Sequence, residues 1–108
     1  LLSKEKDYQL ILGAAAMSRL GRYTVSLEEE SGNGRADIIM RPNRSGLPNI
    51  ILEMKRSDSV KDLESDSSKA ISQIEEKGYF RNMKGRTLLY GISFNGKSSR
   101  ISMKEMTG

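Results

Sequence analysis

The chain has 108 residues, and its 18 lysines and arginines outnumber its 14 acidic residues, for a formal net charge of +4. This length is typical of one domain with a single modest core. Cysteine and histidine are both absent, which excludes disulfide scaffolds, zinc fingers, thiol nucleophiles and chemistry that relies on a histidine base. The basic balance slightly favours a polyanionic partner. A bound metal, if there is one, should be magnesium or manganese, which favour oxygen ligands.

Nothing in the sequence divides it into parts, because it has no repeat, low-complexity tract or linker-like segment. We therefore expect residues 1–108 to form a single domain. The chain begins at Leu1 rather than at methionine, and we expect it to be a fragment of a longer protein. No secretory signal or bilayer-spanning run is visible, so we expect a cytoplasmic location and no membrane partner.

The first expected element is a helix over residues 3–20. Ser3 can cap its N-terminus, and Glu5 places an acidic side chain in the first turn, where the helix dipole favours it. Apolar side chains concentrated in residues 10–17 give this helix a broad buried face. Gly21 is well placed to end it.

Three strands are expected next. Apolar and polar residues alternate over residues 23–28, which predicts a half-buried strand. The Ser-Gly-Asn-Gly turn at residues 31–34 should return the chain antiparallel into the apolar run 36–40. A second turn over residues 42–48 leads into another apolar run, residues 49–55, which should be a third, buried strand.

A long helix and two strands complete the predicted order. Apolar side chains near helical spacing predict the helix from about Ser59, and Gly78 marks its end. Residues 88–94 form another apolar strand, and the Asn-Gly pair at 95–96 is a hairpin signal that leads to an edge strand over residues 100–103. This order of elements predicts an α/β (α+β) fold.

Charged residues stand inside two of the strands that should be buried. Asp37 lies near the start of the second strand, and Glu53 and Lys55 close the third. Such residues are costly to bury unless they are paired, protonated or metal-bound. Side chains alternate along a strand, so Glu53 and Lys55 point to one face. If the two strands pair, two carboxylates and an ammonium group can meet, which is an arrangement able to hold a hard divalent cation beside an activated water.

Each of these residues also has an ordinary structural interpretation. Asp37 could cap a turn or pair with Arg35, and Arg35 itself could contact a phosphate or hold the adjacent loop. Glu53 and Lys55 could form a solvated ion pair on a strand edge, as charged residues often do. The two interpretations stay open at the level of single residues.

The motifs and the order of elements together resemble the PD-(D/E)XK nuclease superfamily. Residues 30–37, Glu-Ser-Gly-Asn-Gly-Arg-Ala-Asp, resemble the Glu-Ser-Gly-x-Gly-Arg-x-Asp signature of a bacterial branch found C-terminal to AAA-ATPase-like domains. Residues 50–55, Ile-Ile-Leu-Glu-Met-Lys, resemble its Ile-Ile-Ile-Glu-Phe-Lys strand, and residues 73–79 and 91–97 resemble its next helix and final strand. The resemblance implies a restriction-endonuclease-like α-β-β-β-α-β core, in which helices flank a mixed central sheet, here with an added C-terminal edge strand.

The resemblance also implies a metal site. Asp37 and Glu53 would bind magnesium or manganese, with the backbone carbonyl of Met54 as an additional ligand. Glu5 matches a position where many members carry an accessory acidic ligand. The alternative for Glu5 is that it serves only as a favourable acid in the first turn of a helix.

The implied function is metal-dependent hydrolysis of DNA, most simply by an endonuclease. Lys55 would orient or polarise the attacking water or stabilise charge on the phosphate, and Gln73 would contact the substrate unless it is ordinary surface polarity. One alternative is a catalytically silent module of the same fold that binds DNA or an AAA-ATPase-like domain fused upstream. A further alternative is a homodimer that acts like a Holliday-junction resolvase.

Overall fold

The computed structural model describes residues 13, 18, 20–30 and 35–107. The helix expected over residues 3–20 therefore lies outside the described residues, apart from Gly13 and Ser18, which are helical. Glu5 and the turn at residues 31–34 also lie outside them. The predictions made for those segments stay predictions.

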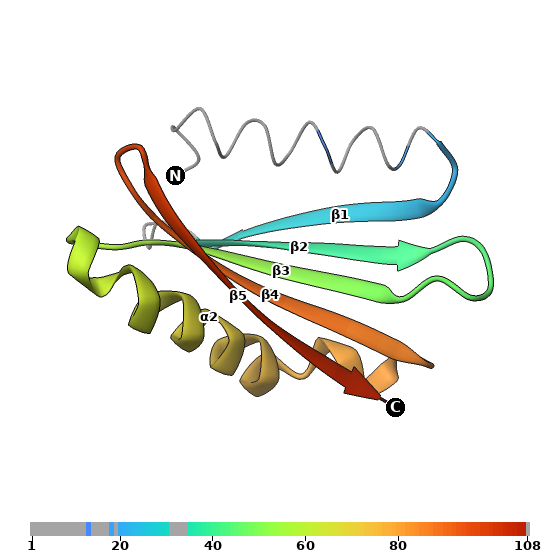
Figure 1. The fold of residues 1–108 in the computed structure, drawn as a ribbon. Helices are drawn as coiled ribbons and strands as arrows, with labels where there is room; N and C mark the ends of the chain where they lie inside the picture. The colour runs from blue at the N-terminus through green and yellow to red at the C-terminus, as the bar shows by residue number, and fades with distance from the viewer. Residues whose placement is uncertain (1–12, 14–17, 19, 31–34, 108) are drawn as a thin grey trace.

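The described chain is built on one mixed sheet of five strands in the order β1-β2-β3-β4-β5. β3 and β4 run parallel, and the other neighbours are antiparallel. Figure 1 shows the strands fanning across the molecule, with β5 crossing β4 at the front. The strands are β1 (Tyr23–Glu30), β2 (Arg35–Pro42), β3 (Asn49–Arg56), β4 (Arg86–Asn95) and β5 (Ser98–Thr107). The predicted strands and the mixed sheet are confirmed, and the expected edge strand is longer than its sequence indicates.

The helix α2 (Leu63–Lys77) connects the parallel strands β3 and β4. A short 3-10 turn, η1 (Val60–Asp62), leads into it, and η2 (Tyr79–Asn82) follows it. Gly78 ends α2 in the left-handed conformation at φ 69°, as the sequence predicts. In the described part of the chain the sheet carries this one helix on one face, rather than helices on both faces as expected (Figure 1). No helix in that part is long and apolar enough to cross a membrane.

The central strands are apolar on both faces, and this is why they appear in the sequence as continuous apolar runs. One cluster lies between the sheet and α2, and it contains Ile39, Ile51, Ile71, Ile74 and Leu89. A second cluster lies on the opposite face, and it contains Tyr23, Ile38, Met40, Leu52, Met54, Ile92 and Phe94. Residues that alternate with the second cluster along β2 and β3 therefore face α2.

A glycine in β4 allows α2 to lie very close to the sheet. A Cβ atom at Gly91 would collide with the backbone carbonyl oxygen of Ser67 in α2 and press against Ala70 and Ile71. Beside this contact, the Ser67 hydroxyl lies 2.7 Å from the hydroxyl of Ser102 on β5. Since Gly91 is paired in register with Glu53 of β3, this contact fixes the distance between α2 and the strand that carries the predicted site.

Candidate functional site

The carboxylates of Asp37 and Glu53 come together at the centre of the sheet. The two residues are directly paired in the register of β2 and β3, and directly opposed side chains of an antiparallel pair lie on the same face. They are 1% and 0% exposed, respectively. Two acidic side chains that the sequence separates by sixteen positions are therefore adjacent and buried, as expected if the two strands paired.

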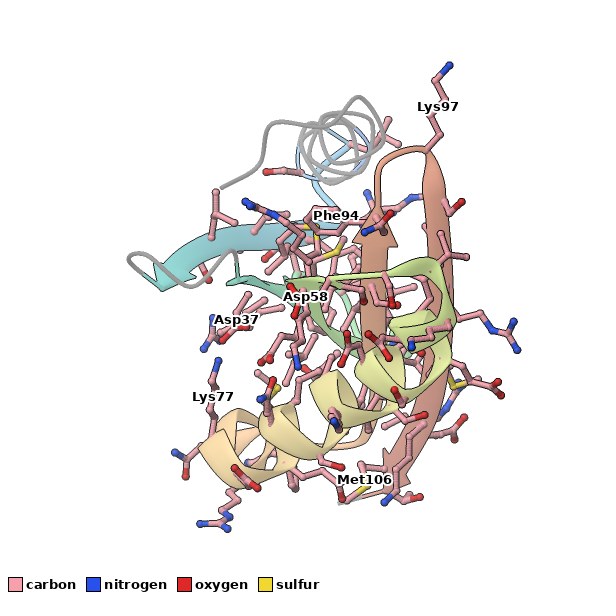
Figure 2. The ribbon with its side chains drawn as sticks, turned by 90° about the vertical axis from the view of Figure 1, so that its left-hand side faces the viewer. Asp37, Asp58, Lys77, Phe94, Lys97 and Met106 are labelled. Atoms are coloured by element: carbon pink, nitrogen blue, oxygen red, sulfur yellow. The ribbon has the colours of Figure 1, made fainter. Side chains whose placement is uncertain are left out.

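The cation that meets both carboxylates is Lys77, at the C-terminal end of α2. Its Nζ atom lies 2.7 Å from Asp37 Oδ2 and 3.0 Å from Glu53 Oε1. Figure 2 shows the Lys77 side chain reaching from α2 towards Asp37. Long helical side chains point back towards the helix N-terminus, which carries this ammonium from the last turn of α2 to the middle of β3. The Lys77 ammonium group thus forms ion pairs with both buried carboxylates.

Lys55, which was expected to join the carboxylates, makes a different ion pair. Its Nζ atom lies 3.3 Å from Asp66 Oδ1 on α2, and the two side chains are 24% and 12% exposed. The pKa of Asp66 is lowered from its usual value, first by the nearby Ser57 hydroxyl and then by the Lys55 ammonium, while burial acts in the opposite direction. Ser57 Oγ is itself buried and has no partner in good hydrogen-bond geometry among the described residues, so we attribute its effect to the proximity of its dipole.

Gln73 lies one helical turn before Lys77, where residues four apart are neighbours on a helix surface. Its Oε1 atom is buried and has no hydrogen-bond partner within the described part of the chain. Met54 packs its side chain into the cluster on the opposite face of the sheet, while its main chain lies between Glu53 and Lys55 in a strand paired on both sides. These positions do not test the roles expected for Gln73 and the Met54 carbonyl, which stay predictions.

Two charged residues of the site, Lys77 and Asp66, were not assigned a role from the sequence. Both belong to one stripe of α2 that also contains Gln73 and the buried Ala70. Polar residues on the core-facing stripe of an amphipathic helix depart from the usual pattern. That departure is the signal in the sequence that could have identified them.

The donor set at this point suits a hard divalent cation. Magnesium is commonly held by one or two carboxylates together with waters and substrate phosphates, and Asp37 and Glu53 supply two carboxylates side by side. No group of three or more acidic residues that could hold a metal forms among the described residues. The amide oxygen of Gln73, which is buried and has no hydrogen-bond partner among the residues that the structure describes, is a further oxygen of the kind such ions accept. The residues therefore fit magnesium or manganese bound by two carboxylates.

One comparison with known proteins gives a match. The family model described as the PD-(D/E)XK nuclease superfamily matches residues 3–104, which is nearly the whole chain. The match spans both strands that carry the carboxylates and the helix that carries Lys77. Neither a curated protein nor a solved structure matches the chain with significance.

Proposed function

Because the chain belongs to the PD-(D/E)XK nuclease superfamily, we propose that it is a metal-dependent nuclease domain that hydrolyses DNA phosphodiester bonds. The observation that carries the proposal is the pairing of Asp37 with Glu53 on adjacent central strands, both buried. Burying two carboxylates together is costly, and replacing buried ionic groups by apolar ones is often neutral or stabilising. A chain that keeps both acids in its core is therefore expected to use them.

In this proposal, Asp37 and Glu53 hold magnesium or manganese, with the Met54 carbonyl as a further ligand. When bound, the ion lowers the pKa of the attacking water and offsets the negative charge that builds on the phosphate. Lys55 stands two residues beyond Glu53 on the same face of β3, and Asp66 holds its ammonium group in place. From there Lys55 supplies a compact positive charge to the attacking water or the phosphate.

Gln73 has a positioning role in the same proposal. Its side-chain oxygen is buried next to Lys77 along α2 and can accept a hydrogen bond from a water or a metal-bound group. A neutral amide adds no charge to the site, so its contribution is orientation rather than electrostatic stabilisation. Glu5, the remaining acid implied by the resemblance, would add a ligand from the N-terminal segment.

A second candidate is a catalytically silent module that binds DNA or an upstream AAA-ATPase-like domain. The observation that favours it is the Lys77 ammonium, which already neutralises part of the charge of Asp37 and Glu53 without a metal. A lysine fixed permanently in that position would keep the fold stable but would take the place of the metal, so the domain could not hydrolyse DNA.

Cleavage assays separate these functions. The purified chain is incubated with plasmid, linear and four-way-junction DNA and with RNA, each with magnesium, with manganese and with a chelator. The nuclease proposal predicts divalent-dependent cleavage that is lost in Asp37→Asn and Glu53→Gln and kept in Glu76→Gln, a control that changes an exposed acid of α2. Cleavage that survives both site substitutions would refute the site. DNA binding without cleavage would favour the silent module, and junction cleavage by a dimer would favour the resolvase-like alternative.

A further inference from the structure

Lys77 Nζ contacts one oxygen of each carboxylate, as a divalent ion bound between these two oxygens would. We propose that Lys77 is an exchangeable internal cation: its ammonium group holds Asp37 and Glu53 together when no metal is present, and it leaves when a divalent ion enters. Lys77 would then set the affinity of the site for metal. This inference rests on the proposed function, because it assumes that the carboxylates are a metal site.

The ammonium group and a divalent ion cannot both contact the same two carboxylate oxygens. Lys77 Nζ lies 2.7 Å and 3.0 Å from the two carboxylate oxygens, whereas magnesium binds oxygen at about 2.1 Å. An ion shared by the same two carboxylates would therefore fall within a few ångströms of the ammonium nitrogen. Two positive charges that close together repel each other strongly where water is largely excluded. An ion that binds the two oxygens now in contact with Lys77 would therefore displace the ammonium group.

The position of Lys77 in the fold allows that displacement. Its side chain is 22% exposed, unlike the carboxylates that it contacts, and it is the last residue of α2. The negative end of the helix dipole lies at this terminus and stabilises a cation near it. A flexible four-carbon side chain at such a position can turn its charge towards solvent without unfolding the helix. The Lys77 ammonium group can therefore move from the carboxylates into solvent.

Lys55 would not take part in the exchange. Its ammonium pairs with Asp66, which lies eleven positions before Lys77, about three turns along α2. The charge of Lys55 is thus tied to an acid outside the carboxylate pair. The two lysines therefore have different roles. Lys77 stabilises the metal-free site, and Lys55 stays beside the site when the metal has entered.

The first test measures manganese affinity without DNA, by isothermal titration calorimetry at about pH 8, where free carboxylates are fully ionised. Lys77→Met keeps most of the length of the side chain and removes its charge. We expect manganese to bind this variant about tenfold more tightly than the parent chain, within the usual range of coupling between sites. Lys104→Met is the matched control. Lys104 lies on β5 and forms an exposed ion pair with Glu75 of α2, so its substitution should leave the manganese affinity unchanged.

A second measurement uses the unaltered chain, so that it does not depend on whether a variant folds. The reactivity of each lysine towards an amine-acylating reagent is followed by mass spectrometry with and without manganese. Lys77 should become several-fold more reactive when the ion binds, because its ammonium leaves the carboxylates, whereas Lys55 and Lys104 should not change. Unchanged reactivity of Lys77 in the ion-bound chain would overturn the exchange.

The outcomes distinguish this inference from the proposed function. One outcome is that Lys77→Met binds manganese no more tightly than the parent chain does, while binding to the parent chain is lost in Asp37→Asn. That result would overturn the exchange but would still support the metal site. Binding to Lys77→Met but not to the parent chain would support the exchange and refute the nuclease function for this chain. If manganese bound neither protein, the exchange would be overturned and the silent module would be the surviving function.

Discussion

Removing the charge of Lys77 tests how the buried carboxylates are stabilised when no metal is bound. In Lys77→Met, Asp37 and Glu53 keep their positions on β2 and β3 but lose the ammonium group that lies 2.7 Å and 3.0 Å from them. Two adjacent carboxylates at 1% and 0% exposure then face each other. We expect the metal-free variant to be strongly destabilised.

The size of the expected loss in the free energy of unfolding follows from the burial of the two carboxylates. Removing one partner of a buried ion pair typically costs about 3–5 kcal/mol, because the other charge is left uncompensated. The 22% exposure of Lys77 gives water some access to the site. This access reduces the loss, and we expect a decrease in the free energy of unfolding of about 2–3 kcal/mol. The exposed pair of Lys104 and Glu75 should be worth at most about 1 kcal/mol.

Urea denaturation followed by circular dichroism measures this difference. With a slope of roughly 1–3 kcal/mol per molar urea, the expected loss moves the midpoint of Lys77→Met down by on the order of 1 M. Lys104→Met should move it much less. Adding Asp37→Asn to Lys77→Met should restore part of the lost stability, because it removes one of the two repelling charges. A midpoint for Lys77→Met equal to that of Lys104→Met would refute the reasoning.

Three further predictions concern the surroundings of the site. Gly91→Ala should lower the free energy of unfolding by about 1–3 kcal/mol, because its methyl group collides with the Ser67 carbonyl; an unchanged urea midpoint would contradict the close packing of α2 on β4. Because the pKa of Asp66 is lowered, its ionised carboxylate stabilises the fold. This stabilisation is complete above the usual carboxyl pKa of about 4 and is lost as the pH falls through the lowered pKa. Asp66→Asn should therefore lose less stability than the parent chain during acid titration, and parallel titration curves would argue against this. Lys55→Met should slow DNA cleavage by on the order of 100-fold and leave the manganese affinity nearly unchanged, whereas unimpaired cleavage would remove Lys55 from the mechanism.

The fold was largely predictable because its central strands carry strong local signals. β2 and β3 are apolar on both faces and bounded by turn residues, and Gly78 marks the end of α2 in the sequence and in the structure. β5 was underestimated because it is an edge strand whose large apolar residues Ile101 and Met103 are exposed. This strand is paired with β4 along its whole length, and backbone pairing leaves little pattern in the side chains.

The candidate site was predictable only in part. The pairing of Asp37 with Glu53 follows from strand order and register, which the turns and apolar runs indicate. The partners of these acids and of Lys55 depend on how α2 is rotated and how closely it lies on the sheet, and Gly91 controls that distance. These are long-range properties, and local sequence patterns do not specify them. The sequence therefore identified the carboxylates but not the lysine that meets them.

The most direct test of the central claim is a manganese titration of the parent chain beside Asp37→Asn and Glu53→Gln, with Glu76→Gln as the control. If the two buried acids are the metal site, manganese binds the parent chain and the control with the same affinity, and each site substitution weakens binding by at least about tenfold. Binding of equal strength in all four proteins would contradict the account, because the ion would then be held elsewhere.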